Sequence, residues 1–252
     1  MKALITGASS GIGRDIAIEL SKRGYDLILV ARNKDKLNET AKYCSTNVDV
    51  YPLDVSTVEN CKKIHDEFKD IDLLVNNAGF GLFGEFVETD LNRELEMIDL
   101  NIKSVHTLTK LYLKDMIKKD SGRILNVASS AAFLSGPLMS TYYSTKSYVY
   151  RLTTAIYEEL RRIKSNVKVS VLCPGPVATN FNNVADVSFA VKALTSRYVA
   201  KYTVDKMLKN KLIIIPGSSV RLGIFATRLL PLKVLLKINY NIQRKKDDND
   251  EK

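Results

Sequence analysis

Cysteine and histidine are scarce in this chain of 252 residues, and their scarcity argues against several kinds of site. The three cysteines, Cys44, Cys61 and Cys173, lack metal or redox spacing and fit a reducing compartment. With only His65 and His106, neither a histidine-based metal site nor a hydrolase triad is expected. An apolar strand expected from residue 2 leaves no room for a signal peptide. We therefore expect a cytoplasmic protein without a bound metal.

Linkers, low-complexity runs and internal repeats are also missing from residues 1–218. Apolar runs that resemble strands alternate with helical stretches here, at residues 2–6, 27–31, 48–53, 71–75, 123–128, 167–173 and 211–215. This alternation predicts an α/β fold, with a doubly wound parallel seven-stranded sheet and helices on both faces, in a single Rossmann-type domain. Residues 219–252 are then a C-terminal extension.

Acidic residues are few toward the C-terminus. Residues 186–252 carry 14 basic and 6 acidic side chains, which is most of the net charge of +10. No nucleic-acid motif accompanies this charge, so binding to an anionic membrane surface or an anionic substrate is the better functional interpretation. The alternative is a basic surface that only faces solvent.

The segment from Val220 to Ile242 mixes apolar residues with arginine and lysine and contains Pro231, so it is too charged to span a bilayer. It fits a membrane surface, its own domain or a partner subunit. We expect residues 243–252 to be a charged, disordered end.

A glycine-rich loop follows the first expected strand. It is Thr6-Gly7-Ala8-Ser9-Ser10-Gly11-Ile12-Gly13, and apolar residues at helical spacing come after it. Glycines allow the backbone to approach a pyrophosphate, and the helix N-terminus offers N–H groups and a positive dipole. The spacing differs from the commoner G-x-G-x-x-G. The loop predicts a dinucleotide site, with an unliganded tight turn as the alternative.

The second expected strand lacks the acidic residue that would bind a ribose 2′-hydroxyl in an NAD site. Arg32 stands there instead, and a guanidinium suits a 2′-phosphate. Arg14, Ser9 and Ser10 are further candidates for that pocket. This pattern favours NADP(H) over NAD(H), unless Arg32 is a solvated surface charge.

A tyrosine and a lysine four residues apart, Tyr142 and Lys146, are expected on one face of a helix from about residue 142 to 163. An ammonium group beside a phenol favours the phenolate and lowers the pKa of the tyrosine, which then exchanges a proton with an alcohol or carbonyl oxygen. Tyr143 is excluded because Ser147, not lysine, lies four residues further.

Taken in order, these motifs resemble those of the short-chain dehydrogenases/reductases, over residues 1–218. The motifs that carry this resemblance also include Asp54-Val55, Asn76-Asn77-Ala78-Gly79, Asn101, Ser129 and residues 174–179. The family's spacing favours Ser129 over Ser130. The resemblance implies catalytic roles for Asn101, Ser129, Tyr142 and Lys146, with Asn101 distorting its helix and holding a water near the lysine.

The cofactor-binding residues follow from the same motifs. They are Gly7, Ser9, Ser10, Gly11, Ile12, Gly13, Arg32, Asp54, Val55, Asn77, Ala78, Gly79, Tyr142, Lys146, Pro174, Gly175, Val177 and Thr179. Asp54 has helix N-capping as an alternative role.

The resemblance places a substrate lid at about residues 183–210, where Phe181, Val184, Val187, Phe189 and Val191 indicate an apolar substrate. The stretch 195–208 has the pattern of an amphipathic helix. The extended tail is similar to that of DltE-like oxidoreductases. The family also implies a homodimer or homotetramer through helices around 101–119 and 142–163.

The sequence thus predicts an NADP(H)-dependent oxidoreductase that moves a hydride between the nicotinamide and a carbonyl or alcohol, with Tyr142 as the general acid/base. Three alternatives stay open. These are a non-catalytic NADP(H)-binding protein, a membrane-surface protein, and an epimerase or dehydratase on the same scaffold.

Overall fold

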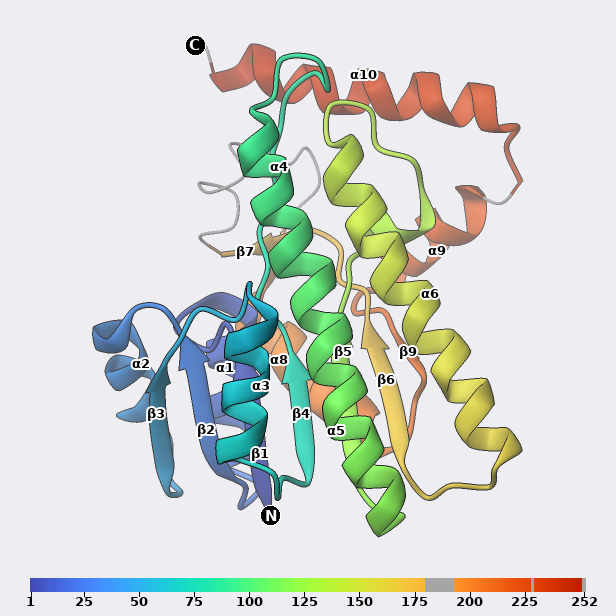
Figure 1. Ribbon diagram of the computed structural model, residues 1–252. Helices are drawn as coiled ribbons and strands as arrows, with labels where there is room; N and C mark the ends of the chain where they lie inside the picture. The colour runs from blue at the N-terminus through green and yellow to red at the C-terminus, as the bar shows by residue number, and fades with distance from the viewer. Residues whose placement is uncertain (180–192, 228, 251–252) are drawn as a thin grey trace.

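Seven short apolar segments form the central sheet in this computed structural model, which describes residues 1–179, 193–227 and 229–250 (Figure 1). The strands are parallel and lie in the order β3-β2-β1-β4-β5-β6-β9. Their bounds are β1 (Lys2–Thr6), β2 (Asp26–Ala31), β3 (Val48–Pro52), β4 (Leu73–Asn76), β5 (Arg123–Val127), β6 (Lys168–Leu172) and β9 (Ile213–Ile214). The predicted parallel seven-stranded α/β fold is confirmed.

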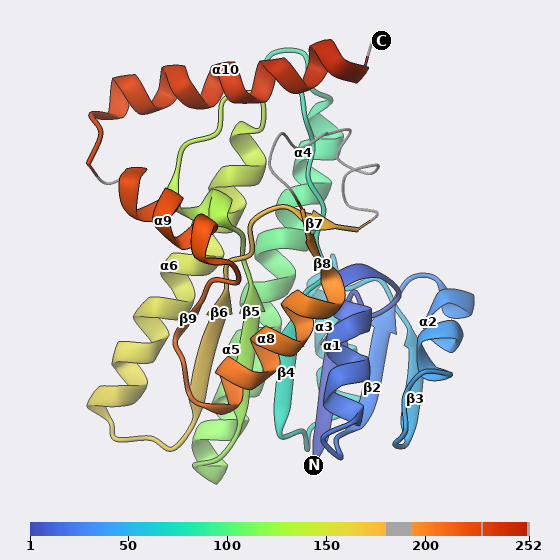
Figure 2. The ribbon, with the colours of Figure 1, turned by 180° about the vertical axis from the view of Figure 1, so that it is seen from behind.

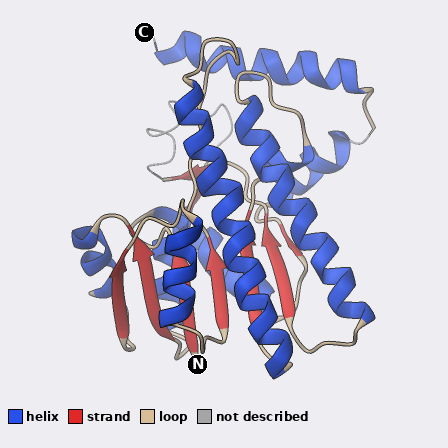
Figure 3. Ribbon diagram, viewed as in Figure 1, coloured by secondary structure: helices blue, strands red, loops and turns tan. Residues whose placement is uncertain are grey.

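The side chains of each strand alternate between two cores, because successive residues point to opposite faces of a sheet. In β1, Ala3 and Ile5 pack in one core and Leu4 packs in the other. The first core is covered by α1 (Gly11–Ser21), α2 (Lys34–Ala41) and α8 (Ser196–Leu208), and the second by α3 (Val58–Glu67), α5 (Val105–Lys119) and α6 (Ser140–Arg162). Figures 1 and 2 show these layers from opposite sides, and Figure 3 separates helices from strands by colour.

The helical stretch expected from residue 91 to 113 is interrupted. It consists of α4 (Leu91–Ile98), a π-helical turn (Asp99–Ser104) and then α5. Single π-turns inside α-helices are frequent at functional sites. Here the turn carries Asn101, a polar residue that is fully buried.

The predicted lid range divides into two parts. Residues 180–192, which include the apolar residues 181–191 named above, lie outside the described residues. Helix α8 packs on α1 and the sheet through Val199, Val204 and Met207, so this part of the range belongs to the core. The short parallel pair β7 (Val177–Ala178) and β8 (Leu194–Thr195) joins the loop that follows β6 to the start of α8.

Two helices form the C-terminal extension, α9 (Ser218–Thr227) and α10 (Leu232–Asp250). Both views place α10 beyond the ends to which the strand arrows point (Figures 1 and 2). The expected disordered end from residue 243 is wrong, since the helix continues to Asp250. Gln243, 2% exposed, packs on the body of the protein and attaches α10 by a hydrogen bond to Tyr143. No sequence motif indicates this contact. Within the described ranges, no helix is long and apolar enough to cross a membrane.

Candidate active site

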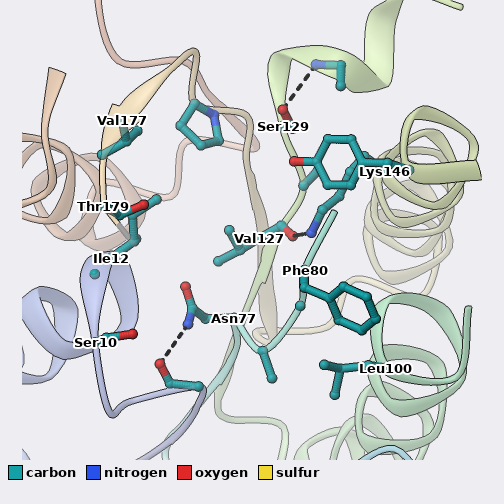
Figure 4. Close-up of a pocket in the computed structure, with 18 of the residues that line it drawn as sticks. Ser10, Ile12, Asn77, Phe80, Leu100, Val127, Ser129, Lys146, Val177 and Thr179 are labelled. Carbon is teal, nitrogen blue, oxygen red and sulfur yellow. Dashed lines mark hydrogen bonds between the residues drawn. The ribbon is translucent and has the colours of Figure 1, made fainter. Parts of the chain in front are cut away.

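A cavity of about 830 Å³ lies at the carboxyl ends of the strands, where open parallel sheets bind their ligands. Its volume is in the upper part of the usual range for ligand pockets, roughly 300–1,000 Å³. Every predicted site residue lines this cavity except Gly13 and Asn101. Figure 4 shows the two ends of the cavity, with Ser10, Ile12 and Thr179 on one side and Ser129 and Lys146 on the other.

The glycine loop between β1 and α1 adopts a backbone that other residues resist. Gly7 and Gly11 have positive φ angles of 65° and 54°. Gly13 is needed for a different reason: a Cβ there would lie 2.4 Å from both the Gly7 carbonyl oxygen and the Asn77 Nδ2 atom. The loop is therefore packed against the residues that follow β4, and Gly13 acts from behind the cavity wall.

Thr6 holds these two segments together, a role that the sequence interpretation missed. Its hydroxyl oxygen accepts hydrogen bonds from the backbone N–H groups of Asn77 (3.0 Å) and Ala78 (3.1 Å). The Asn77 side chain donates back to the carbonyls of Thr6 (3.0 Å) and Gly7 (3.2 Å). The signal was available, because Thr6 directly precedes the first glycine of the motif.

The residues around the start of α1 fit a dinucleotide pyrophosphate. The hydroxyl of the N-cap residue Ser10 makes no capping hydrogen bond, whereas Asn33, Thr57 and Asp90 do cap α2, α3 and α4. The Ser10 side chain therefore does not bind the first N–H groups of α1, which lie at the cavity. The N-terminus of a helix attracts anions. The Gly7 and Gly11 backbone gives such a group room.

The adenosine end of the cavity is formed by the ends of β2 and β3. Arg32 is exposed and lines the cavity directly after β2, where no acidic residue is present. Asp54 lines it after β3 and accepts a hydrogen bond from the Ser56 N–H (2.9 Å). The alternative role of Asp54 as a helix cap is wrong, because Thr57 caps α3 by accepting from the Asn60 N–H.

The other end of the cavity brings together Ser129, Tyr142 and Lys146. Ser129 follows β5 and accepts a hydrogen bond from the Ala131 N–H (3.1 Å), while its hydroxyl also bonds to Tyr142. Tyr142 and Lys146 lie one turn apart on α6, and the Lys146 Nζ atom is 5.8 Å from the centre of the tyrosine ring. It donates to the Val127 carbonyl at 3.2 Å (Figure 4).

Burial sets the protonation states of Tyr142 and Lys146. Desolvation raises the pKa of Tyr142 well above its ordinary value, and the hydrogen bond with Ser129 only partly opposes this. Lys146 was expected to lower the pKa of Tyr142, but without a cofactor it does not, because its buried ammonium group donates to a backbone carbonyl instead. Burial also lowers the pKa of Lys146 to about 8. At neutral pH the tyrosine is thus a neutral proton donor beside a lysine that titrates near pH 8.

Asn101 braces this arrangement from behind. Its Nδ2 atom donates to the Phe80 carbonyl (2.9 Å) and the Thr145 hydroxyl (3.1 Å), and its Oδ1 atom accepts from the Phe80 N–H (3.1 Å). A Cβ on Gly79 would lie 2.7 Å from that Oδ1 atom and 3.3 Å from the Lys146 Nζ atom. The π-turn therefore connects the loop after β4 to α6.

The loop after β6 closes the side opposite Tyr142. Pro174, Gly175 and Val177 line the cavity, and the Thr179 methyl group is 3.1 Å from where a Gly11 Cβ would be. The loop thus contacts the glycine loop through Thr179, a contact that the motifs did not predict.

Several lining residues had not been predicted. Phe80, Met139 and Tyr143 surround Tyr142 with apolar surface. Further unpredicted lining residues include Arg93, Glu96 and Asp99 from α4 and its π-turn, and Asn239, Ile242 and Gln243 from α10. No motif marks these residues, since only the folded chain brings them to the cavity. Among the described residues, no cluster of histidine, cysteine and acidic side chains could hold a metal ion.

The fold and the cavity define a Rossmann-type dinucleotide-binding protein, and comparison with known proteins identifies its family. The sequence model of the short chain dehydrogenase family matches residues 1–187. An uncharacterised oxidoreductase of Staphylococcus epidermidis is 36% identical over 188 residues, which cover 73% of this chain and 81% of that protein. The chain belongs to the short-chain dehydrogenase family.

Solved structures agree with this assignment. A short-chain dehydrogenase from Sphingobium yanoikuyae in complex with NADPH has a TM-score of 0.82 and 25% identity, covering 90% of this chain and 92% of that one. A short chain dehydrogenase/reductase from Burkholderia phymatum in complex with NAD has a TM-score of 0.81 and 25% identity, covering 88% and 91%. Both kinds of nicotinamide cofactor therefore occur among the similar folds.

Proposed function

We propose that this protein is an NADP(H)-dependent oxidoreductase that reduces a carbonyl group of an apolar small molecule, or oxidises the corresponding alcohol. The observation that carries the proposal is the convergence of Ser129, Tyr142 and Lys146 in the same cavity as the glycine loop. The bound cofactor supplies the hydride chemistry. The chain supplies binding, orientation and the proton.

Each residue has a role that its surroundings support. Tyr142 protonates the carbonyl oxygen as negative charge develops there, and its raised pKa keeps the proton in place until then. Ser129 donates a hydrogen bond to the same oxygen. Lys146, with a pKa of about 8, binds the cofactor ribose and returns a proton to Tyr142. Asn101 keeps Lys146 and the loop after β4 in register.

The preference for NADP(H) is supported by Arg32, which is exposed at the cavity edge where an NAD site would have a carboxylate. A guanidinium pairs with a phosphate through charge-assisted hydrogen bonds. An apolar substrate is supported by Phe80, Met139 and Tyr143 around the catalytic end.

The direct test combines cofactor binding with turnover. Thermal unfolding is followed with NADPH, NADH and neither, since a ligand at a hundred times its dissociation constant stabilises by about 2.7 kcal/mol. NADPH oxidation is then followed with a series of aldehydes and ketones. Tyr142→Phe should lower turnover by roughly 10²-fold or more and keep NADPH binding.

Two outcomes would refute the proposal or favour an alternative. Full activity of Tyr142→Phe would remove the assigned proton donor. NADPH binding without NADPH oxidation on any carbonyl would favour a binding protein, or an epimerase or dehydratase that returns its hydride.

We further propose that α9 and α10 contact an anionic membrane surface. Leu222, Phe225, Leu232 and Ile238 are exposed on these helices, and residues 211–246 contain eight basic and no acidic residues. Apolar side chains flanked by cations are typical of segments that bind anionic lipid.

Flotation with phosphatidylserine vesicles tests this contact. Lys233→Glu with Lys237→Glu should weaken binding at least tenfold, since each cation near an anionic surface contributes about 1 kcal/mol. The matched control reverses Lys62 and Lys63, two exposed lysines on α3, and should bind as the wild type does. Equal loss of vesicle binding in both double variants would show general charge attraction and refute the assigned surface.

Assembly into a homodimer or homotetramer through residues 101–119 and 142–163 stays a prediction.

A further inference from the structure

The helix α10 contributes one wall of the cavity, although it lies beyond the residues that the family model matches. Asn239, Ile242 and Gln243 line the same cavity as Ser129 and Tyr142. Asn239 and Gln243 are one turn apart and buried, at 8% and 2% exposed, whereas most other side chains between Leu232 and Arg244 are exposed. Burying two amide groups against the body costs free energy unless they are hydrogen-bonded.

Both amides do make hydrogen bonds, and both reach the segment around the start of α6, next to the catalytic tyrosine. The Asn239 Nδ2 atom donates to the Ser135 carbonyl at 2.6 Å. The Gln243 Nε2 atom donates to the Tyr143 hydroxyl at 2.7 Å. Ser135 lies in the loop before α6, and Tyr143 lies in the first turn of α6. The helix α10 is therefore attached where the substrate end of the cavity begins.

The position of Tyr143 is itself fixed. A Cβ on Gly136 would lie 2.3 Å from the Tyr143 ring, so the ring packs directly on the glycine backbone. The rings of Tyr142 and Tyr143 are in edge contact, with centroids 6.1 Å apart. Because the two tyrosines are neighbours in the chain and their rings are in contact, Tyr143 connects α10, through Gln243, to the ring of Tyr142.

We infer that Gln243 is a specificity-determining residue, which limits the width of the substrate end through its hydrogen bond to Tyr143. This inference rests on the carbonyl chemistry proposed above and adds a substrate class to it. With α10 attached, Ile242 and Gln243 line the same cavity as Met139 and bound it on the side of this helix. The site then takes narrow apolar carbonyl compounds in preference to broad ones. Loss of this hydrogen bond leaves α10 held through Asn239, lets the part of the helix around Gln243 move outward and widens the cavity.

The test compares three variants with the wild type. Gln243→Leu removes the donor with little change in volume, and Tyr143→Phe removes the acceptor. The control, Asn241→Leu, makes the same kind of amide-to-leucine change at an exposed position of α10. NADPH oxidation is measured with carbonyl compounds of graded width, from propanal through acetophenone to benzophenone.

The expected result is a change of preference. The ratio of kcat/KM for benzophenone to that for propanal should rise roughly three- to tenfold in Gln243→Leu and Tyr143→Phe, the range that corresponds to losing one neutral hydrogen bond. The double variant should match Tyr143→Phe, because that change already removes the bond to Gln243, together with the bond between the Tyr143 hydroxyl and Asn239. Asn241→Leu should keep the wild-type ratio.

A second measurement does not depend on turnover. Amide hydrogen exchange in α10 should be faster in Gln243→Leu and Tyr143→Phe than in the wild type and the control, because the helix loses an attachment. Wild-type turnover with unchanged ratios and unchanged exchange in both variants would overturn the role of Gln243 alone. Failure of the wild type to oxidise NADPH with any compound of the series would instead refute the proposed function.

Discussion

Replacement of Lys146, the lysine with a catalytic role in the proposed function, should stabilise the protein while removing the proposed activity. Lys146 is 5% exposed, and burial lowers its pKa from 10.5 to about 8. A shift of this size corresponds to about 3 kcal/mol of unfavourable free energy for keeping the ammonium group charged in the folded chain. Lys146→Met removes the charge and keeps a similar unbranched side chain.

The expected gain is smaller than the full cost. The hydrogen bond from Lys146 to the Val127 carbonyl (3.2 Å) is lost, which costs about 1 kcal/mol. The variant should therefore be about 2 kcal/mol more stable than the wild type at pH 7 in the absence of cofactor. For a chain of this size the melting temperature should rise by roughly 4–8 °C.

The dependence on pH distinguishes this cause from a general packing effect. The folded chain releases the Lys146 proton near pH 8, whereas the unfolded chain keeps it until about pH 10.5. Within this window the unfolded state binds more protons, so wild-type stability from this group rises with pH. Below pH 8 the cost is fully present. By pH 10 the charge cost has fallen below about 1 kcal/mol, so the advantage of Lys146→Met should be largely gone.

Chemical denaturation of both proteins at pH 7 and pH 10 measures this difference. Lys110→Met, at an exposed position of α5, is the matched control and should change stability by less than about 0.5 kcal/mol. The reasoning is refuted if Lys146→Met is less stable than the wild type at pH 7, or if its advantage is the same at both pH values.

Three further changes test other parts of the site. Arg32→Gln should weaken NADPH binding roughly tenfold or more and leave NADH binding unchanged, because a charge-assisted hydrogen bond contributes about 1.5–3 kcal/mol. Calorimetry with both cofactors measures this, and equal losses of affinity for NADPH and NADH would contradict it. Gly13→Ala should abolish cofactor-induced stabilisation, since its Cβ would lie 2.4 Å from backbone oxygen, whereas Gly24→Ala, with no atom within 4 Å, should cost only about 1 kcal/mol for its positive φ and keep binding. Asn101→Leu should lower the unfolding free energy by about 2–3 kcal/mol, because it leaves the half-buried backbone N–H and carbonyl groups of Phe80 without their partner. Denaturation at pH 7 checks this, and an unchanged midpoint would argue against this role of Asn101.

The sequence by itself determined the sheet and the edge of it at which the predicted cofactor-binding residues lie. Continuous apolar runs mark strands that are buried on both faces, and parallel strands place their carboxyl ends at one edge. Residues that follow different strands, such as Asn77 and Ser129, are therefore predicted to meet from their positions in the chain alone. The spacing of Tyr142 and Lys146 likewise places them on one helix face, whatever the helix packs against.

Only the tertiary structure decided what depends on surroundings. Tyr142 has a raised pKa because it is buried, and no spacing to Lys146 could reveal how much water the fold removes. Gln243 and Tyr143 are 100 residues apart, and the apolar pattern of α10 shows that a helix has a face to bury but not which surface receives it. Hydrogen bonds across such separations depend on where whole helices dock, which local sequence does not encode.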